Sequence, residues 1–288
     1  MQPLIEHRLE LAGFDTRALE LEGEGPPVVF LHGFADSADT WRSVLDKLAR
    51  VDRRALAVDL PGFGTADPLH PDGSMLEQLD AFARAAVEHV AEEAGEVILS
   101  GNSLGGCVSL RVAQDDAAPI AGVVPIAPAG LEMPRWFSLI ESDPFVKLVL
   151  QSPIPLPEPI LRAAVGEAYR QLAFARPRAA AREAVRAFTD HHRSKDMVTR
   201  ILANGRRLLP ELTPPPFELE KITCPVLLVW GDRDRMVTHK GAALITEALP
   251  DTDYQLLEGI GHCPQVEVPD RIARLLLEFA EAPSHRAA

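Results

Sequence analysis

One short motif in the sequence has the residue types and spacing of a catalytic nucleophile. Residues 101–105 read Gly-Asn-Ser-Leu-Gly, the pattern Gly-x-Ser-x-Gly, between an apolar run at 97–100 and a helix-like segment that begins at Leu104. At a sharp strand-to-helix turn, such a serine is held in a strained conformation with its hydroxyl exposed, and the glycines let the strand and the helix approach closely. The positive N-terminal end of the helix favours negative charge on the serine. The motif therefore predicts that Ser103 is a nucleophile.

A serine hydroxyl needs a neighbouring base, which is most often a histidine. Of nine histidines, His262 stands out because the segment 259–262 reads Gly-Ile-Gly-His and lies between the last strand candidate and the last predicted helix. Its glycines allow a tight loop that can project the imidazole toward Ser103. Hydrolases with this serine turn have the chain order serine, acid, histidine. We therefore predict that His262 is the base.

The acid of such a triad holds the imidazole in the correct tautomer and stabilises the imidazolium. Chain order places it between Ser103 and His262, in a loop that follows a strand. Two carboxylates, Asp232 and Asp234, follow the apolar run 226–230 and compete for the role. We favour Asp234, and we expect Asp232 to be a turn residue that bonds its own backbone.

A loop early in the chain can supply the oxyanion hole. His32, Gly33 and Phe34 directly follow the apolar run 27–31. Backbone amides in this loop and after the nucleophile can donate to a developing oxyanion, and we assign the two donors to Phe34 and Leu104. We expect His32 to orient the loop and to take no part in the chemistry.

The elements that must position these residues alternate along the chain. Residues 5–21 alternate polar and apolar residues around a glycine, which predicts a hairpin. Short apolar runs with the length of buried strands follow at 27–31, 55–58, 97–99, 120–126, 226–230 and 254–257. Helical patterns occupy 40–50, 104–115, 240–249 and 269–280, and a further helix begins at a Ser74–Glu77 capping box and ends at Gly95. The alternation predicts an α/β fold with a mostly parallel, doubly wound sheet.

One long stretch breaks this alternation. From about 129 to 217 there is no clear buried strand, and the stretch holds closely spaced prolines followed by an Ala/Arg-rich, helix-like sequence. It predicts a helical insertion at 129–215, between core segments at 1–128 and 216–288.

Composition bounds the environment and the partners. The chain has 288 residues, a formal net charge of −13 and three cysteines. The acidic balance and the lack of a basic patch argue against nucleic acid as a partner. Sparse cysteines without a Cys-x-x-Cys pair predict neither a disulfide framework nor a zinc site, and they favour a cytoplasmic setting. The charged residues 1–11 predict no signal peptide, and the absence of a long apolar run predicts no membrane span. A homodimer is one option for the oligomeric state.

Taken together, these motifs resemble the α/β-hydrolase superfamily, in particular its capped, lipase- and esterase-like members. The matching segments span residues 28 to 268; they are 32–34, 59–64, 101–105, 231–234 and 261–262. The resemblance implies Asp234 as the acid, a helical cap at 129–215 and no metal or organic cofactor. Serine at the position of the nucleophile argues against haloalkane dehalogenases and epoxide hydrolases, which use aspartate there.

The predicted activity is hydrolysis of a small-molecule ester with an apolar acyl or alkyl group. Carbon–carbon bond hydrolases of ring-cleavage diketo acids carry a similar Gly-Asn-Ser turn and remain an alternative. They differ at the oxyanion loop and have an aromatic residue after the histidine, where this chain has Cys263. Further alternatives are acyl transfer to an acceptor other than water and a ligand receptor that keeps the triad.

Several other residues have two interpretations. Six apolar residues of the insertion suit either an acyl pocket or cap packing: Trp136, Phe137, Phe145, Val146, Leu148 and Val149. Four arginines suit either a solvated helix face or the binding of a substrate carboxylate: Arg162, Arg170, Arg182 and Arg186. We expect Cys263 to pack and Asp59 to shape the sheet edge.

Overall fold

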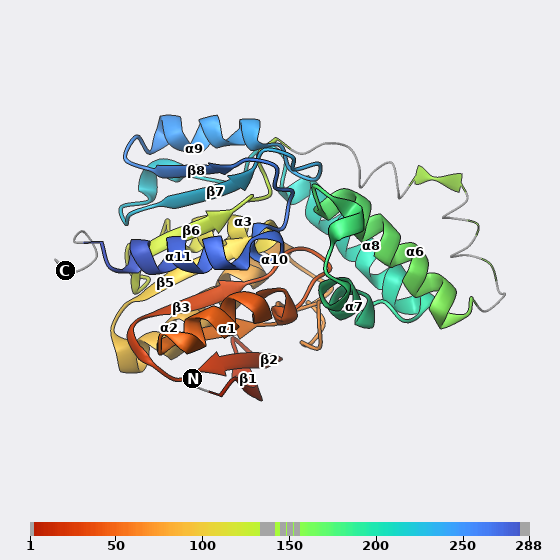
Figure 1. The fold of residues 1–288 in the computed structure, drawn as a ribbon, viewed down its shortest axis with the longest axis horizontal. Coiled ribbons are helices and arrows are strands. Elements are labelled where there is room, and N and C mark those ends of the chain that lie inside the picture. Colours follow the sequence, from red (N-terminus) through yellow and green to blue (C-terminus); the bar gives the residue numbers. More distant parts are fainter. Residues whose placement is uncertain (1–2, 133–141, 145–147, 149–151, 153–155, 283–288) are drawn as a thin grey trace.

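The computed structural model describes residues 3–132, 142–144, 148, 152 and 156–282, and its centre is a twisted eight-stranded sheet (Figure 1). The spatial order is β1-β2-β4-β3-β5-β6-β7-β8. The hairpin β1–β2 and the β2–β4 pair are antiparallel, and every other neighbouring pair is parallel. The strands are β1 (Ile5–Leu11), β2 (Phe14–Leu21), β3 (Glu24–Leu31), β4 (Arg53–Val58), β5 (Val97–Asn102), β6 (Ile120–Ile126), β7 (Leu227–Gly231) and β8 (Asp253–Leu257).

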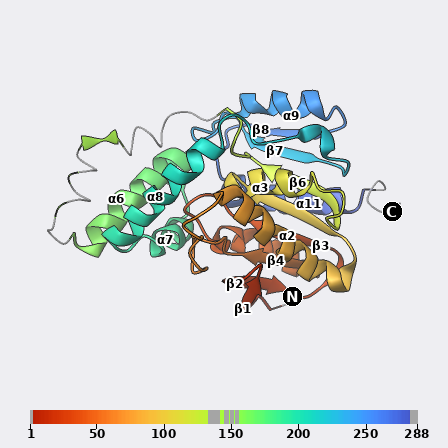
Figure 2. The same cartoon turned by 180° about the vertical axis from the view of Figure 1, so that it is seen from behind.

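Helices cover both faces of the sheet, as the alternation of the sequence predicts. Helices α1 (Arg42–Arg50) and α11 (Pro269–Ala280) pack on one face. Helices α2 (Met75–Ala94), α3 (Leu104–Val112) and α9 (Ala242–Ala248) pack on the other (Figure 2). The shorter helices are η1 (Ala38–Trp41), η3 (Leu219–Lys221), η4 (His239–Gly241) and α10 (Pro264–Glu267).

Side chains of the buried strands contribute to two separate hydrophobic cores, one on each face of the sheet. In β3, Val28 and Phe30 pack with the α1/α11 layer, whereas Val29 and Leu31 pack with the α2/α3 layer. Successive side chains of a strand point to opposite faces, so a continuous apolar run serves both layers at once. This explains why the parallel strands appear in the sequence as unbroken apolar runs and the β1–β2 hairpin as an alternation.

The predicted helical insertion lies between β6 and β7. Its helices are α6 (Glu158–Ala173), η2 (Pro177–Ala179), α7 (Arg182–Asp190) and α8 (Lys195–Glu211), and no strand occurs among the described residues of this stretch. They form a layer beside one end of the sheet (Figure 1). Leu148 is 67% exposed, whereas Trp136, Phe137, Phe145, Val146 and Val149 lie outside the described residues. In the part of the chain that the structure describes, no helix combines the length and apolar character needed to cross a membrane.

The N-terminus of α2 is capped in part by a residue that local sequence does not indicate. The Ser74 hydroxyl accepts a bond from the Glu77 amide at 3.1 Å, as predicted. The Glu211 carboxylate, from the end of α8, accepts bonds from the Ser74 hydroxyl and from the amides of Met75 and Leu76. The capping therefore joins the insertion to the core, whereas the sequence predicted only the local Ser74–Glu77 capping box.

Asp59, at the end of β4, is a fully buried junction between three chain segments. Its carboxylate accepts two bonds from the Arg17 guanidinium, each 3.1 Å, and further bonds from the amides of Ala38 and Thr65. Burial raises the pKa of Asp59, but the bonds from Arg17 and the nearby charges outweigh it and bring the pKa below its ordinary value. A side chain at Gly64 would place its Cβ 2.3 Å from this carboxyl group, so the loop needs glycine there.

Replacing Asp59 with asparagine should destabilise the protein. Asp59→Asn removes the charge of the fully buried one of two carboxylates that bond the Arg17 guanidinium, whose side chain is only 12% exposed, while Asp39 stays bonded to it. We therefore expect the free energy of unfolding to fall by about 3 kcal/mol, the lower end of the cost of breaking a buried ion pair. The matched control is Asp46→Asn, which removes an exposed ion pair with Arg50 and should cost less than about 1 kcal/mol. Urea unfolding of both variants tests this, and equal losses would contradict it.

Candidate active site

Ser103 occupies the turn that joins β5 to α3. Its φ of 54° and ψ of −111° lie in a region that non-glycine residues rarely adopt. The turn is held by a 2.9 Å bond from the Ser103 amide to the Ile126 carbonyl on β6. A Cβ at Gly101 would lie 2.2 Å from the backbone of Gly105, and one at Gly105 would lie 2.3 Å from the Leu31 carbonyl oxygen. The two glycines therefore permit the close approach that the motif predicts.

His262 and Asp234 are hydrogen-bonded, with 2.7 Å between Nδ1 and Oδ2. Both side chains are buried, at 3% and 0% exposure. The amides of Met236 and Val237 donate to Oδ1 of Asp234 at 2.7 and 3.0 Å, and the Trp230 indole donates to Oδ2 at 3.1 Å. The carboxylate is thus immobilised and directed at the imidazole, so Nδ1 carries the proton and Nε2 is left to act as a base.

The rival carboxylate, Asp232, has a different partner. Its Oδ1 accepts a 2.6 Å bond from the amide of Gly259, at the start of the loop that carries His262. We expected a bond to its own turn, and the structure instead places the bond across to the neighbouring loop. Asp232 thereby helps to hold the histidine loop against the end of β7.

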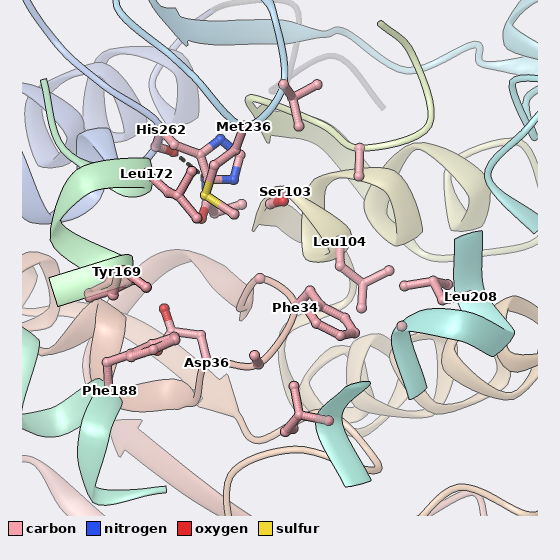
Figure 3. A pocket seen from close by; sticks show the side chains of 18 of the residues that line it. Phe34, Asp36, Ser103, Leu104, Tyr169, Leu172, Phe188, Leu208, Met236 and His262 are labelled. Atoms are coloured by element: carbon pink, nitrogen blue, oxygen red, sulfur yellow. Dashed lines mark hydrogen bonds between the residues drawn. The ribbon is translucent and has the colours of Figure 1, made fainter. Parts of the chain in front are cut away.

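One cavity brings the predicted residues together. Ser103 and His262 both line it, together with Phe34 and Leu104, the two residues predicted to supply oxyanion donors. Figure 3 shows the His262 imidazole beside the Ser103 hydroxyl, with Phe34 and Leu104 on the opposite side of that hydroxyl from the imidazole. The arrangement suits a serine that is deprotonated from one side and whose attack product is stabilised from the other.

His32 supports the loop that carries Phe34. The ring is fully buried, its Nε2 accepts a 2.8 Å bond from the Leu60 amide, and its Nδ1 lies 2.7 Å from the Gly33 carbonyl oxygen. The imidazole is therefore neutral and protonated on Nδ1, and burial lowers its pKa to about 4. This is the orienting position that the sequence predicts for His32.

The buried His32 should make stability depend on pH. The pKa of His32 in the folded protein, about 4, lies below the ordinary histidine pKa of 6.5, so its contribution to stability is complete above pH 6.5 and is lost as the pH falls toward 4. We expect the unfolding free energy of the wild type, relative to His32→Gln, to drop by about 2 to 3 kcal/mol between pH 7.5 and 4.5. Urea titrations of both proteins at each pH measure this; a constant difference would contradict it.

Sequence reasoning missed a polar pair that joins the serine turn to the histidine loop. Asn102 donates from Nδ2 to the His262 carbonyl at 3.0 Å, and its Oδ1 accepts a 3.1 Å bond from Gln265. Both side chains are buried, at 2% and 0% exposure. Their partners lie some 160 positions apart in the chain, so no local pattern identifies them. The one available signal is the position of Asn102 within Gly-x-Ser-x-Gly.

Glu267, also missed, ties the histidine loop to the insertion. Its carboxylate accepts bonds from the amides of Gly261 at 2.6 Å and Ala175 at 3.1 Å. The His262 amide in turn donates to the Ala173 carbonyl, at the end of α6, at 2.8 Å. The backbone around His262 is thus bonded directly to the insertion.

Removing the Asn102 amide should slow the reaction of Ser103 with a serine-directed probe. We expect Asn102→Ala to reduce labelling by a fluorophosphonate about 10-fold or more, because the His262 loop loses a bond that positions it. The control is Ser100→Ala, on the same strand as Asn102, which removes a buried hydroxyl that donates to the Val124 carbonyl of β6 and does not touch the histidine loop. Equal slowing in both variants would show a general loss of stability and no positioning role.

Cys263, next to the predicted base, is buried among packed side chains. Cys263 is 3% exposed, lies 3.9 Å from the Tyr169 hydroxyl, and has its thiol pKa raised well above the usual range by burial. This surrounding fits the packing role expected for it. Among the described residues, no group of three or more His, Cys, Asp or Glu side chains could hold a metal ion.

The family model of the α/β-hydrolase family matches residues 28–275. The chain belongs to this family. A similar curated protein is a pimeloyl-[acyl-carrier protein] methyl ester esterase of Yersinia pseudotuberculosis, 27% identical over 273 residues that cover 90% of this α/β hydrolase and 95% of that protein. A dihydrolipoyllysine-residue acetyltransferase component of an acetoin cleaving system from Pseudomonas putida is 25% identical, over 94% of this chain and 68% of that protein.

Solved structures share the fold of this α/β hydrolase. A bacterial membrane phospholipase A superimposes with a TM-score of 0.78 at 23% identity, over 99% of this chain and 87% of that one. A 2-hydroxy-6-oxo-6-phenylhexa-2,4-dienoate hydrolase from Rhodococcus superimposes with a TM-score of 0.77 at 20% identity, over 98% of this chain and 100% of that one. The predicted fold class is therefore confirmed.

Proposed function

We propose that this α/β hydrolase is a serine esterase that cleaves carboxylic esters with an apolar acyl group. The observation that carries the proposal is the Asp234–His262 pair, which faces Ser103 inside one cavity whose walls are mostly apolar. The similarity to a methyl ester esterase over most of both chains supports ester hydrolysis.

In the proposed first half-reaction, Ser103 Oγ attacks the ester carbonyl carbon while Nε2 of His262 takes the hydroxyl proton. The carbonyl oxygen becomes an oxyanion, and the amides of Phe34 and Leu104 donate to it. As the tetrahedral intermediate collapses, the carbon–oxygen bond to the alcohol breaks and His262 returns the proton to the leaving alcohol. The product is an acyl ester of Ser103, with Asp234 ionised throughout.

The second half-reaction repeats these steps with water. His262 takes a proton from water, the hydroxide attacks the acyl carbonyl, and the carboxylic acid leaves as Ser103 regains its proton. The proton that Ser103 loses leaves with the alcohol and a proton from water replaces it, so Ser103 and His262 end the cycle as they began it.

The walls of the cavity favour an apolar acyl chain. The α8 side contributes a continuous aliphatic surface, and no lysine or arginine lies among the described residues of the lining. Of the arginines considered for substrate binding, Arg162 is paired with Glu158 and Asp190, Arg170 lies 3.6 Å from Glu167, and Arg182 and Arg186 are exposed outside the lining. A diketo-acid substrate of a carbon–carbon hydrolase would bring a carboxylate without a cationic partner, so the ester is the better fit.

The proposal includes a cap role for the insertion. Side chains of α6, α7 and α8 line the same cavity as Ser103. We therefore propose that residues 129–215 cap a core made of 1–128 and 216–288.

Turnover of a p-nitrophenyl ester series from acetyl to dodecanoyl tests this function. We expect hydrolysis by the wild type with an optimum at a medium or longer chain, and a loss of about 10⁴-fold or more in Ser103→Ala and His262→Ala. The matched control is His239→Ala, a partly buried histidine that lies outside the lining of the cavity, which should keep its turnover.

Each other outcome identifies an alternative. Hydrolysis that survives Ser103→Ala would exclude the mechanism. Fast cleavage of vinylogous diketo acids with little ester turnover would favour the carbon–carbon hydrolase. Ester products formed with added alcohol would indicate acyl transfer, and tight ligand binding without turnover would indicate a receptor.

A further inference from the structure

The cavity has two chemically different sides, separated by Ser103 and Phe34 (Figure 3). One side is aliphatic and includes Leu104 and Leu208. The other lies on the His262 side and contains Tyr169, Phe188 and the carboxyl group of Asp36. The mechanism above uses none of the last three residues, and we call this second side the Asp36 side.

Asp36 is a buried carboxyl group in a largely apolar wall. It is 6% exposed and lines the cavity, and its Oδ1 accepts a 2.9 Å bond from the Ser37 amide. Burial raises its pKa to about 7, although the Ser37 amide and the Thr40 hydroxyl both lower it. The charged and titratable groups around it are Asp39, His191, Tyr169 and Cys263. Keeping a carboxyl here costs stability, and the catalytic acid is Asp234, so the group calls for another role.

We infer that the Asp36 side binds the leaving alcohol of the ester, and that this alcohol carries a second hydroxyl group that hydrogen-bonds to the Asp36 carboxyl. The inference rests on the proposed esterase function and specifies its substrates as esters of diol- or polyol-type alcohols.

The chemistry of the first half-reaction assigns the alcohol to this side. His262 must protonate the leaving oxygen, so the alcohol lies on the imidazole side of the scissile bond. Cys263, next to His262, contacts the hydroxyl of Tyr169, and both groups are close enough to Asp36 to interact with it electrostatically. The acyl chain then extends along the aliphatic side, past Leu104 and Leu208.

The surroundings of Asp36 select the polar group of the alcohol. An anionic group would meet this carboxyl, with no lysine or arginine among the described residues of the lining. An ammonium group would find a counter-charge only while Asp36 is ionised, and a pKa of about 7 leaves part of the molecules neutral near pH 7. The ring faces that could stabilise the cation otherwise are occupied, since Tyr169 and Phe188 stack on each other at 3.8 Å and Phe188 stacks on His192 at 4.6 Å. A hydroxyl fits a carboxyl in either protonation state, because it donates to the ionised form and accepts from the neutral form.

The test compares two esters of one acid on the same protein. Hexanoate esters of ω-hydroxyalkyl alcohols with two to five carbons are matched with n-alkyl esters in which a methyl group replaces the hydroxyl. We expect the wild type to favour the hydroxyalkyl ester of the best length by about 10-fold in kcat/KM. Asp36→Leu should abolish or reverse this preference, and Asp36→Asn, which keeps a hydrogen-bonding group, should retain part of it.

For each variant, kcat/KM for the hydroxyalkyl ester is divided by kcat/KM for the matched alkyl ester, so a general loss of activity caused by a change near Phe34 cancels. Fluorophosphonate labelling shows whether Ser103 is still activated in each variant. Equal rates for the matched esters in the wild type, or a preference that survives Asp36→Leu, would overturn the inference while leaving the esterase intact. If no ester is hydrolysed, the proposed function fails. Calorimetry then measures the affinity of Ser103→Ala and of Ser103→Ala/Asp36→Leu for both esters of each pair. We expect Ser103→Ala to bind the hydroxyalkyl ester more tightly and the double variant to lose this preference; equal affinities of Ser103→Ala for both esters would overturn the inference.

Discussion

The backbone conformation of Ser103 places the strongest constraint on this molecule. A non-glycine residue in that region costs on the order of 1–3 kcal/mol and persists only where its surroundings enforce it. Here β3, β5 and β6, three adjacent parallel strands, enforce it: the Ser103 amide bonds to β6, and α3 passes so close to β3 and β5 that no side chain fits at Gly101 or Gly105. The position of the hydroxyl therefore depends on the whole sheet. It also depends indirectly on the two hydrophobic cores, in which helices pack against both faces of the sheet.

Fewer strands hold the loop that carries His262, because this loop follows β8, which lies at the edge of the sheet and has a neighbouring strand on one side only. Bonds from outside the loop compensate for this. Asp232 holds its beginning, Glu267 holds Gly261, and Asn102 holds the carbonyl of His262. These are buried or half-buried contacts to charged or amide groups, which are costly to leave unpaired. A small set of polar side chains thus joins the centre of the sheet to the loop at its edge.

The sequence predicted the parts of this arrangement that depend on local patterns. The strand runs, the glycines of the serine turn and the hairpin all follow from spacing within a few residues, and the structure has them within a few positions of the predicted ends. The predicted helix at 104–115 is shorter, ending at Val112. Asn102, Glu267 and the second capping partner Glu211 escaped prediction because each is a single polar residue whose partners are distant in the chain. Asp36 lies two residues beyond the predicted oxyanion loop at 32–34, and only the folded cavity shows that its carboxyl group is buried in an apolar wall.

The bonds between the histidine loop and the end of α6 restrict how such a protein can diversify. The insertion contributes a backbone carbonyl at Ala173 and a backbone amide at Ala175, and neither contact depends on the identity of a side chain in the insertion. A transplanted helical segment of unrelated sequence could therefore satisfy the histidine loop, provided that its chain passes this point in the same extended path. Recombination at 156–172 and 176–210 would keep these two backbone contacts and the Glu211 cap of α2, whereas a shift of register at 173–175 would disconnect the imidazole from its support. Because the junction is made on the insertion side by backbone groups alone, insertions of different sequence could line different substrate pockets while the catalytic core stays unchanged.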